Sequence, residues 1–259
     1  MKILIQKFFS FFGYTIIKTR FFQEAFKPKN FDQSIFNQKK DLIANVFQLF
    51  KDLGFKPIHI MDVGANHGSW AREVKSIFVD SNFTLIEPQA SLSDSFSDLL
   101  TSAKFEFLNI GVGDKPGYFN FTIEKRDDSS NFRMTEQEAL ESGLKQIKVE
   151  VDTIDNIVKK SKFGFPDILK IDAEGLDIEV LKGAKTILGK TEVVLVEAAV
   201  VNFLFNNNVL NVLNFMDQHG YKLFDITDMN RPLKKNVLWL VELVFIRKNG
   251  FFSKVDWLN

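Results

Sequence analysis

The sequence contains no cysteine among its 259 residues. This absence excludes disulfide bonds, a thiolate nucleophile and a cysteine-ligated zinc site, and it leaves the redox compartment undetermined. Histidine is also scarce, because only His59, His67 and His219 are present. A histidine-rich metal site is therefore not expected, although the question of whether a divalent cation assists any chemistry stays open.

An excess of charge of either sign is missing as well. Lysine and arginine total 33 and aspartate and glutamate total 33, so the formal net charge is zero. A chain without a basic field lacks the electrostatic footprint of a nucleic-acid-binding protein, and we expect no nucleic-acid partner. Apolar residues make up 45% of the chain, which is enough for one large domain with a full core.

Long apolar runs are also absent. No stretch approaches the roughly 20 apolar residues that span a bilayer. The nearest lies at the N-terminus, where Gln6 and Lys7 interrupt the run and no small-residue cleavage site follows, so a secretory signal is not expected. This segment suits either an amphipathic helix on a membrane surface or a partner, or a helix on the protein's own core, and the second interpretation is favoured. The expected compartment is the cytoplasm, with peripheral contact at the inner membrane face left open.

Strand and helix patterns alternate after a helical and irregular start. The expected strands are 58–63, 83–86, 105–110, 118–123, 167–172, 193–197, 221–226 and 238–246. The expected helices are 69–78, 92–100, 176–188 and 209–219. Such alternation predicts an α/β fold, a doubly wound Rossmann-like sheet with helices on both faces. We expect an N-terminal helical extension over 1–55, a main domain over 56–259, and an antiparallel C-terminal hairpin formed by the last two strands.

Two further helix starts and one loop are expected in the middle of the chain. Thr135 and Glu138 have the spacing of a capping box, and Asp152 is expected to cap the helix that follows it. The polar stretch 124–132 is interpreted as a loop. Within it, residues 126–131 suit either a lid over a site or a plain solvated turn.

The most informative segment is Ile60–Gly68, in which an apolar strand ends in an acid and a glycine turn before a helical pattern. Glycine lets the backbone approach a ligand closely, and a helix N-terminus points free N–H groups at it. In a doubly wound sheet, ligands bind beyond the carboxyl ends of the strands. The residues expected at the ligand are therefore Asp62, Gly64, Ala65, Asn66 and Gly68.

A second acid, Glu87, ends the next strand about 20 residues further on, a spacing that suits hydrogen bonds to ribose hydroxyls. Nicotinamide and flavin folds usually carry three glycines around a pyrophosphate, and that pattern is missing here. A negative Asp62 is a poor neighbour for a pyrophosphate but a good one for an ammonium and a sulfonium. The expected cofactor is S-adenosylmethionine, and the alternative is that both acids are turn or capping residues without a ligand.

The segment Leu169–Gly175 places three polar residues where a buried strand ends. Asp172 could orient a substrate hydroxyl or take its proton, and Glu174 could do the same or help to hold a divalent cation. Lys170 has either a role in catalysis or a partner among the core acids, because an unpaired buried charge is costly. The structural alternative for Asp172 is that it caps the following helix.

These segments together resemble the FkbM-type methyltransferases. The resemblance rests on Asp62–Gly68, Glu87-Pro88, Asn109–Asp114, Val151–Asp155, Ile168–Gly175 and Val180–Ala184, and it extends over roughly residues 58–248. Its most specific element is the Lys-Ile-Asp-x-Glu-Gly sequence at Lys170–Gly175. Asp177 stands where the family more often has glutamate, and Glu242 where aspartate is frequent.

The resemblance implies a class I S-adenosylmethionine-dependent methyltransferase, with Gly111 and Val112 added to the cofactor-binding residues. Members commonly methylate hydroxyls of sugars, polysaccharides or secondary metabolites, so a small-molecule or glycan acceptor is expected. Two rival functions remain: a nicotinamide-dependent oxidoreductase acting on sugars, and a non-catalytic binding protein of the same fold. The acceptor's identity and the oligomeric state do not follow from the sequence.

Overall fold

The computed structural model of the chain describes residues 42–126, 129–201, 206–231 and 236–257. The N-terminal segment, interpreted either as a helix on the protein's own core or as an amphipathic surface helix, lies outside these residues, and the division at residue 55 stays a prediction. Among the described helices, none has the length and apolar character needed to cross a bilayer.

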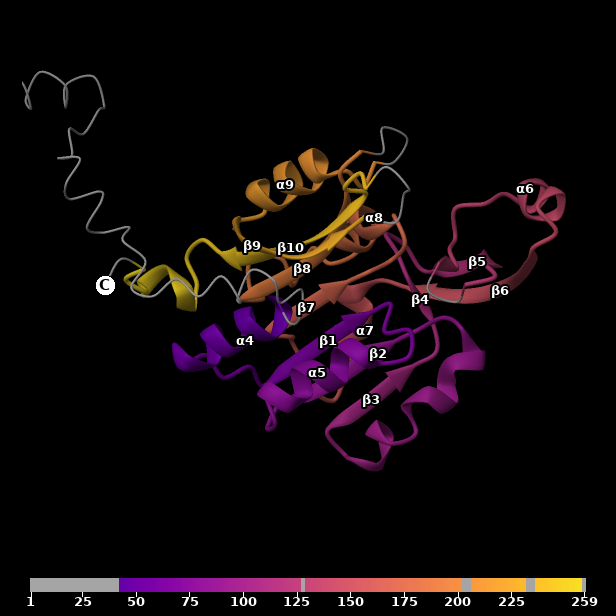
Figure 1. The fold of residues 1–259 in the computed structure, drawn as a ribbon. Coiled ribbons are helices and arrows are strands. Elements are labelled where there is room, and N and C mark those ends of the chain that lie inside the picture. Colours follow the sequence, from indigo (N-terminus) through magenta and orange to yellow (C-terminus); the bar gives the residue numbers. More distant parts are fainter. Residues whose placement is uncertain (1–41, 127–128, 202–205, 232–235, 258–259) are drawn as a thin grey trace, which may run out of the picture. The chain divides into compact units, whose positions relative to one another are not determined.

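The main sheet has seven strands in the order β3-β2-β1-β7-β8-β10-β9 (Figure 1). These strands are β1 His59–Val63, β2 Asn82–Ile86, β3 Phe105–Leu108, β7 Ile168–Ile171, β8 Val193–Ala199, β9 Tyr221–Asn230 and β10 Leu240–Arg247. β10 runs antiparallel to both of its neighbours, and the pairings from β3 to β8 are parallel. The predicted doubly wound sheet and its antiparallel C-terminal pair are confirmed.

The position of β10 adds a detail to that prediction. It lies between β8 and β9, so the last strand is inside the sheet and the preceding one forms its edge. Its residues from Leu243 to Ile246 are all buried, whereas most of β9 is exposed. A continuous apolar run suits a strand that is covered on both faces, which explains this order.

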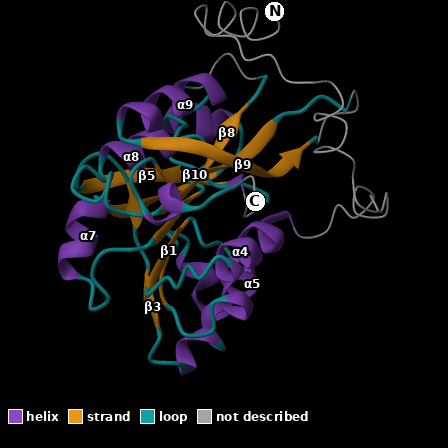
Figure 2. Ribbon diagram, turned by 90° about the vertical axis from the view of Figure 1, so that its left-hand side faces the viewer, coloured by secondary structure: helices purple, strands orange, loops and turns teal. Residues whose placement is uncertain are grey.

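Helices cover both faces of the sheet (Figure 2). On one face, α4 (Leu42–Asp52) and α5 (Ser69–Ile77) pack against alternate strand residues such as Ile60. On the other, α7 (Ile154–Lys160), α8 (Asp177–Lys182) and α9 (Val209–Gln218) pack against residues such as Met61. The two core clusters follow from the period of two along each strand.

A second, three-stranded sheet has the order β4-β6-β5 and lies to one side of the main sheet in Figure 1. Its strands are β4 Gly111–Val112, β5 Gly117–Ile123 and β6 Lys145–Asp152. β5 was predicted from the sequence and β6 was not, although Ile147, Val149 and Val151 alternate there with charged residues. Between β5 and β6 lies α6 (Glu136–Glu141), which begins with the predicted Thr135–Glu138 capping box.

Three local predictions were wrong. Thr153, not Asp152, caps α7, because its hydroxyl accepts from the Asn156 amide while the Asp152 carboxylate accepts from Thr153 N. The expected helix at 92–100 is a pair of 3-10 helices, η1 (Ala90–Phe96) and η2 (Leu99–Thr101). The helix expected to reach residue 188 ends at Lys182. Near the end of the described chain, a further 3-10 helix, η4, spans Phe251–Lys254.

Candidate functional site

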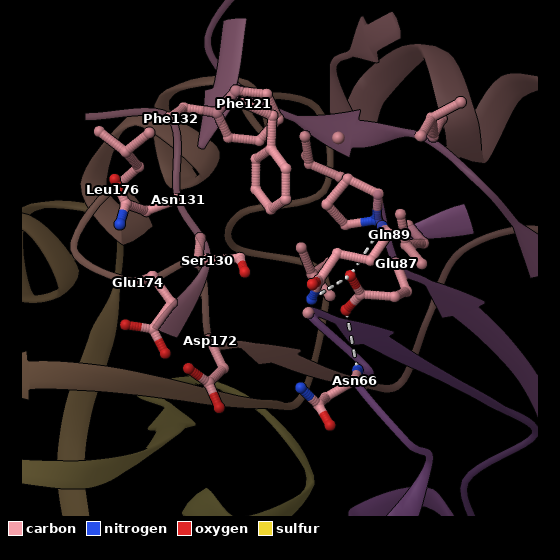
Figure 3. A pocket seen from close by; sticks show the side chains of 18 residues that line it. Asn66, Glu87, Gln89, Phe121, Ser130, Asn131, Phe132, Asp172, Glu174 and Leu176 are labelled. Atoms are coloured by element: carbon pink, nitrogen blue, oxygen red, sulfur yellow. Dashed lines mark hydrogen bonds between the residues drawn. The ribbon is translucent and has the colours of Figure 1, made fainter. Parts of the chain in front are cut away.

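A cavity lies at the carboxyl ends of β1, β2 and β7, where the strand order of the main sheet reverses (Figure 3). Its apolar wall is formed by Val63, Ile86, Ile110, Val112, Phe121, Phe132 and Leu176. The carboxylates of Glu87, Asp172 and Glu174 also line it, and no basic side chain is among the described residues of its wall. The switch point of a doubly wound sheet is the usual place for a ligand in this architecture.

The glycine turn after β1 brings two strand ends together. Gly64 has a φ of +77°, and a Cβ there would lie 1.9 Å from the carbonyl oxygen of Asp172. Any side chain would therefore push β1 and β7 apart at the cavity. Of the residues expected at the ligand in this turn, Gly64 and Asn66 line the cavity, whereas Ala65 and Gly68 are buried beside it.

Glu87 closes the turn from the end of β2. Its Oε2 accepts a hydrogen bond from Asn66 N at 2.9 Å, and its Oε1 accepts from Gln89 N at 2.9 Å and from Gln89 Nε2 at 3.2 Å. Burial raises the pKa of this carboxyl, and the hydrogen bonds from Gln89 and Asn66 act against that rise. A carboxylate has about four acceptor positions, so one is left for a ligand hydroxyl.

Asp172 and Glu174 enter the cavity from the loop after β7, opposite Glu87 (Figure 3). Glu174 has a φ of +50°, a conformation that a non-glycine residue adopts only when its surroundings hold it there. The buried Asp177 supplies that restraint, because its carboxylate accepts from Ala173 N at 3.0 Å and from Gly175 N at 3.2 Å. The structural alternative, in which Asp172 caps the following helix, does not apply, because α8 has no side-chain cap and Asp177 accepts from the loop amides.

Several acids lie behind this loop. Burial raises the pKa of Asp177 to about 7 and that of Glu242 to about 7. Burial, with the charges of Asp172, Asp177 and Glu174 acting in the same direction, raises the pKa of Glu197 to about 10. Glu197 therefore holds a proton at neutral pH. Glu242 and Asp177 titrate near neutral pH.

Lys170 and Asp62 form a buried pair that does not line the cavity. Lys170 Nζ lies 3.5 Å from Asp62 Oδ1 and 3.2 Å from Asp172 Oδ2. Burial disfavours the ammonium, but Asp172, Asp62 and Glu242 outweigh it and raise the Lys170 pKa. Asp62 thus faces a lysine and not the cavity. Of the two interpretations of Lys170, the structure shows the one in which it pairs with a core acid.

The aromatic side of the cavity is formed by two residues that the sequence patterns did not single out. Phe121 on β5 and Phe132 in the following loop have ring centroids 4.6 Å apart, and both belong to the second sheet and its connections. Phe132 fits closely over Gly111, where a Cβ would lie 2.6 Å from the ring. Of the loop 126–131, for which a lid and a solvated turn were the two interpretations, Ser130 and Asn131 line the cavity. Only the pairing of β5 with the undetected β6 could have placed these residues.

The described residues contain no group of three or more histidine, aspartate or glutamate side chains arranged to hold a metal ion. The carboxylates of Asp172 and Glu174, considered above for a divalent cation, are therefore not joined by a third ligand in the described part of the chain.

Residues 62–223 match the family described as the methyltransferase FkbM domain. Among solved structures, a methyltransferase FkbM from Methylobacillus flagellatus is 14% identical with a TM-score of 0.48, and the match covers 73% of this chain and 43% of that one. A 1,6-didemethyltoxoflavin-N1-methyltransferase from Burkholderia thailandensis is 10% identical with a TM-score of 0.43, over 90% of this chain and 92% of that one. The match therefore covers less than half the length of the Methylobacillus protein. No curated protein sequence matches it.

Proposed function

Because the chain belongs to the FkbM domain family of S-adenosylmethionine-dependent methyltransferases, we propose that this cavity binds S-adenosylmethionine and that the methyl acceptor is a hydroxyl oxygen of a sugar, polysaccharide or secondary metabolite. The chain is then an O-methyltransferase. The proposal also includes the cytoplasmic location and the class of acceptor, which were both predicted from the sequence.

The observation that carries the proposal is the charge of the cavity wall. Glu87, Asp172 and Glu174 are the charged side chains of a cavity wall whose other described residues are apolar or uncharged. A nucleoside with ribose hydroxyls and a positive sulfur suits such a wall, because carboxylates accept from hydroxyls and attract positive charge. A pyrophosphate would meet these carboxylates without a basic partner among the described wall residues, which disfavours the nicotinamide alternative.

The positions of several wall residues support a cofactor side of the cavity. Glu87 is placed to accept from ribose hydroxyls, while Asn66 and Gly64 present backbone at the strand end. The apolar residues Val112 and Phe132 suit one face of a purine. When bound, S-adenosylmethionine supplies an electrophilic methyl group on a positively charged sulfur.

The acceptor side is assigned to Asp172, with Glu174 beside it. The Asp172 side chain is 37% exposed at the cavity, and one of its oxygens is held by Lys170. In the proposed reaction Asp172 orients the acceptor hydroxyl and receives its proton as the oxygen becomes methylated. Orientation of the hydroxyl alone is worth several kcal/mol of barrier, because it removes the entropy of finding the reactive alignment.

Calorimetric titration with S-adenosylhomocysteine tests the cofactor assignment. We expect Glu87→Ala to weaken binding by about tenfold or more, a loss of at least about 1.4 kcal/mol. Glu150→Ala, which removes an exposed carboxylate on β6, is the matched control and should bind as the wild type does. Equal affinity of wild type and Glu87→Ala would remove Glu87 from the cofactor site.

Transfer of a labelled methyl group tests the acceptor assignment. Incubation with labelled S-adenosylmethionine and a glycan and metabolite extract should give label that resists mild alkali, as an ether does and an ester does not. Asp172→Asn should lower the rate by about a hundredfold or more, with the affinity for S-adenosylhomocysteine retained. Label that mild alkali releases, or an undiminished rate in the variant, would contradict the proposal.

A further inference from the structure

Asp62, the acid that precedes the glycine turn, was expected from the sequence to lie at the ligand. Its side chain does not reach the cavity. Asp62 is paired in register with Lys170 on the adjacent parallel strand, so the two side chains project from the same face of the sheet. That face is the one covered by α5, whose Trp70 ring lies 5.7 Å from Lys170 Nζ. Asp62 is completely buried there and is absent from the cavity wall.

Lys170 connects this buried acid with the acid at the cavity. The side-chain exposure rises along the series, from 0% for Asp62 through 7% for Lys170 to 37% for Asp172. Neither carboxylate oxygen of Asp62 accepts a hydrogen bond within the described structure, so the ammonium 3.5 Å away is the compensation for its charge. A buried charge needs such a partner, and the partner is held in place by the same interaction.

We propose that Asp62 is a positioning residue that acts through Lys170 on Asp172, and that it does not bind the cofactor. The proposal rests on the proposed function, because it assigns the effect of Asp62 to the acceptor side of the same cavity.

The ammonium group of Lys170 is restrained on several sides. An ammonium has three donors and a flexible four-carbon stem, so it holds a fixed position only when it is restrained on several sides. Asp62 from β1, Asp172 at the end of β7 and the ring of Trp70 from α5 restrain it here, and Glu242 on β10 adds a further negative charge. The bond from Lys170 then fixes Oδ2 of Asp172 and leaves Oδ1 for the acceptor hydroxyl.

Asp62→Asn tests the proposal, because asparagine keeps the size of the side chain and removes its charge. We expect the affinity for S-adenosylhomocysteine to stay within about twofold of wild type, in contrast to Glu87→Ala. The initial rate of label transfer at saturating S-adenosylmethionine should fall by about tenfold or more, while the S-adenosylmethionine concentration that gives half the maximal rate stays unchanged. A residue that only stabilised the fold would not produce this separation.

A spectroscopic measurement follows Lys170 without any acceptor. In ¹⁵N-labelled wild-type protein we expect a protected ammonium signal that is missing in Lys170→Met and is therefore assigned to Lys170. In Asp62→Asn this signal should shift and lose its protection. Asp98→Asn is the matched control, because Asp98 also pairs with a basic side chain, Arg72, but at an exposed site, and neither the signal nor the rate should change.

Two outcomes would overturn the inference. A loss of S-adenosylhomocysteine affinity of about tenfold or more in Asp62→Asn would make Asp62 a cofactor contact. An unchanged rate together with an unchanged ammonium signal would show that it positions nothing. Failure of the proposed function is distinguishable from both, because in that case the wild type itself would bind no S-adenosylhomocysteine or transfer no label.

Discussion

Strand β1 carries a buried titratable side chain near each of its ends, and the two are accommodated in different ways. At the amino end, His59 donates through Nδ1 to the carbonyl oxygen of Gly164 at 3.0 Å and accepts through Nε2 from the Thr84 hydroxyl at 2.9 Å. At the carboxyl end, Asp62 accepts no hydrogen bond within the described structure and relies on the charge of Lys170.

The difference separates a structural end of the sheet from a functional one. Buried polar groups in stable cores are normally hydrogen-bonded, as His59 is, and such a site contributes to folding. A buried ion pair is often no more stable than apolar residues of the same size, and it is retained where it serves another purpose. The carboxyl end of β1 is also where the cavity lies, which agrees with that purpose being functional.

The largest effect is expected from breaking the ion pair on one side only. Lys170→Met leaves Asp62 buried without a counter-charge, and we expect the free energy of unfolding to fall by about 3–5 kcal/mol. Urea denaturation measures this loss. Lys104→Met is the control, since Lys104 pairs with Asp80 at an exposed site and should cost far less. Similar losses in the two variants would mean that Asp62 needs no compensation.

The next largest effect concerns the amino end. His59→Ala removes both hydrogen bonds and leaves the Gly164 carbonyl and the Thr84 hydroxyl without this partner, so we expect a loss of about 2–3 kcal/mol in the free energy of unfolding. The affinity for S-adenosylhomocysteine should not change. His219→Ala, at the half-buried end of α9, should cost less. A loss of S-adenosylhomocysteine affinity in His59→Ala would contradict the assignment of a purely structural role to the amino end of β1.

Replacing the whole ion pair should have the opposite sign. In the double variant Asp62→Leu with Lys170→Met, apolar side chains fill the space of the pair, and we expect a gain of about 1–2 kcal/mol in the free energy of unfolding over wild type. Methyl transfer should be lost at the same time. A double variant that is less stable than wild type would indicate that the pair contributes to folding after all.

The smallest effect is a difference in pH dependence. The pKa of Glu242 is raised from 4.5 to about 7 in the folded protein. Between these two pH values the folded state binds more protons than the unfolded chain, so the contribution of Glu242 to stability falls as the pH rises. Burial lowers the pKa of His59, so its contribution is lost as pH falls below about 6.5. We expect Glu242→Gln to make stability rise more steeply with pH between about 4.5 and 7, by about 1 kcal/mol per pH unit, as followed by urea denaturation.

The control for that measurement is Glu150→Gln on the exposed side of β6, which should leave the pH profile unchanged. Parallel profiles for wild type and Glu242→Gln would show that the Glu242 carboxyl titrates alike in the folded and unfolded states.

Much of the fold followed from patterns that are local in the sequence. The buried strands β1, β7 and β8 are mainly apolar, and Gly64 marks the turn after the first of them. The alternation of apolar residues with lysine and glutamate in β6 is the local pattern of a half-buried strand, but its pairing with β5 could not be predicted. Long-range pairing is a tertiary property that a local pattern does not contain.

The candidate site could be predicted in part for the same reason. Glu87, Asp172 and Glu174 line the cavity because they follow strands whose carboxyl ends meet at one edge of the sheet. The direction of Asp62 could not be predicted, since it depends on which face of β1 the residue occupies and on a lysine more than a hundred positions away in the chain. Phe132 depends on the second sheet, whose pairing was not anticipated.

The order of the last two strands constrains how the protein folds during synthesis. β9 leaves the ribosome before β10, yet its only neighbour in the main sheet is β10. Until residues 240–247 emerge, both β8 and β9 present unpaired backbone edges, which are sites for association with other nascent chains. A pause in translation shortly before codon 240 would prolong that exposed state, and aggregation of the newly made chain should depend on the speed of that final step.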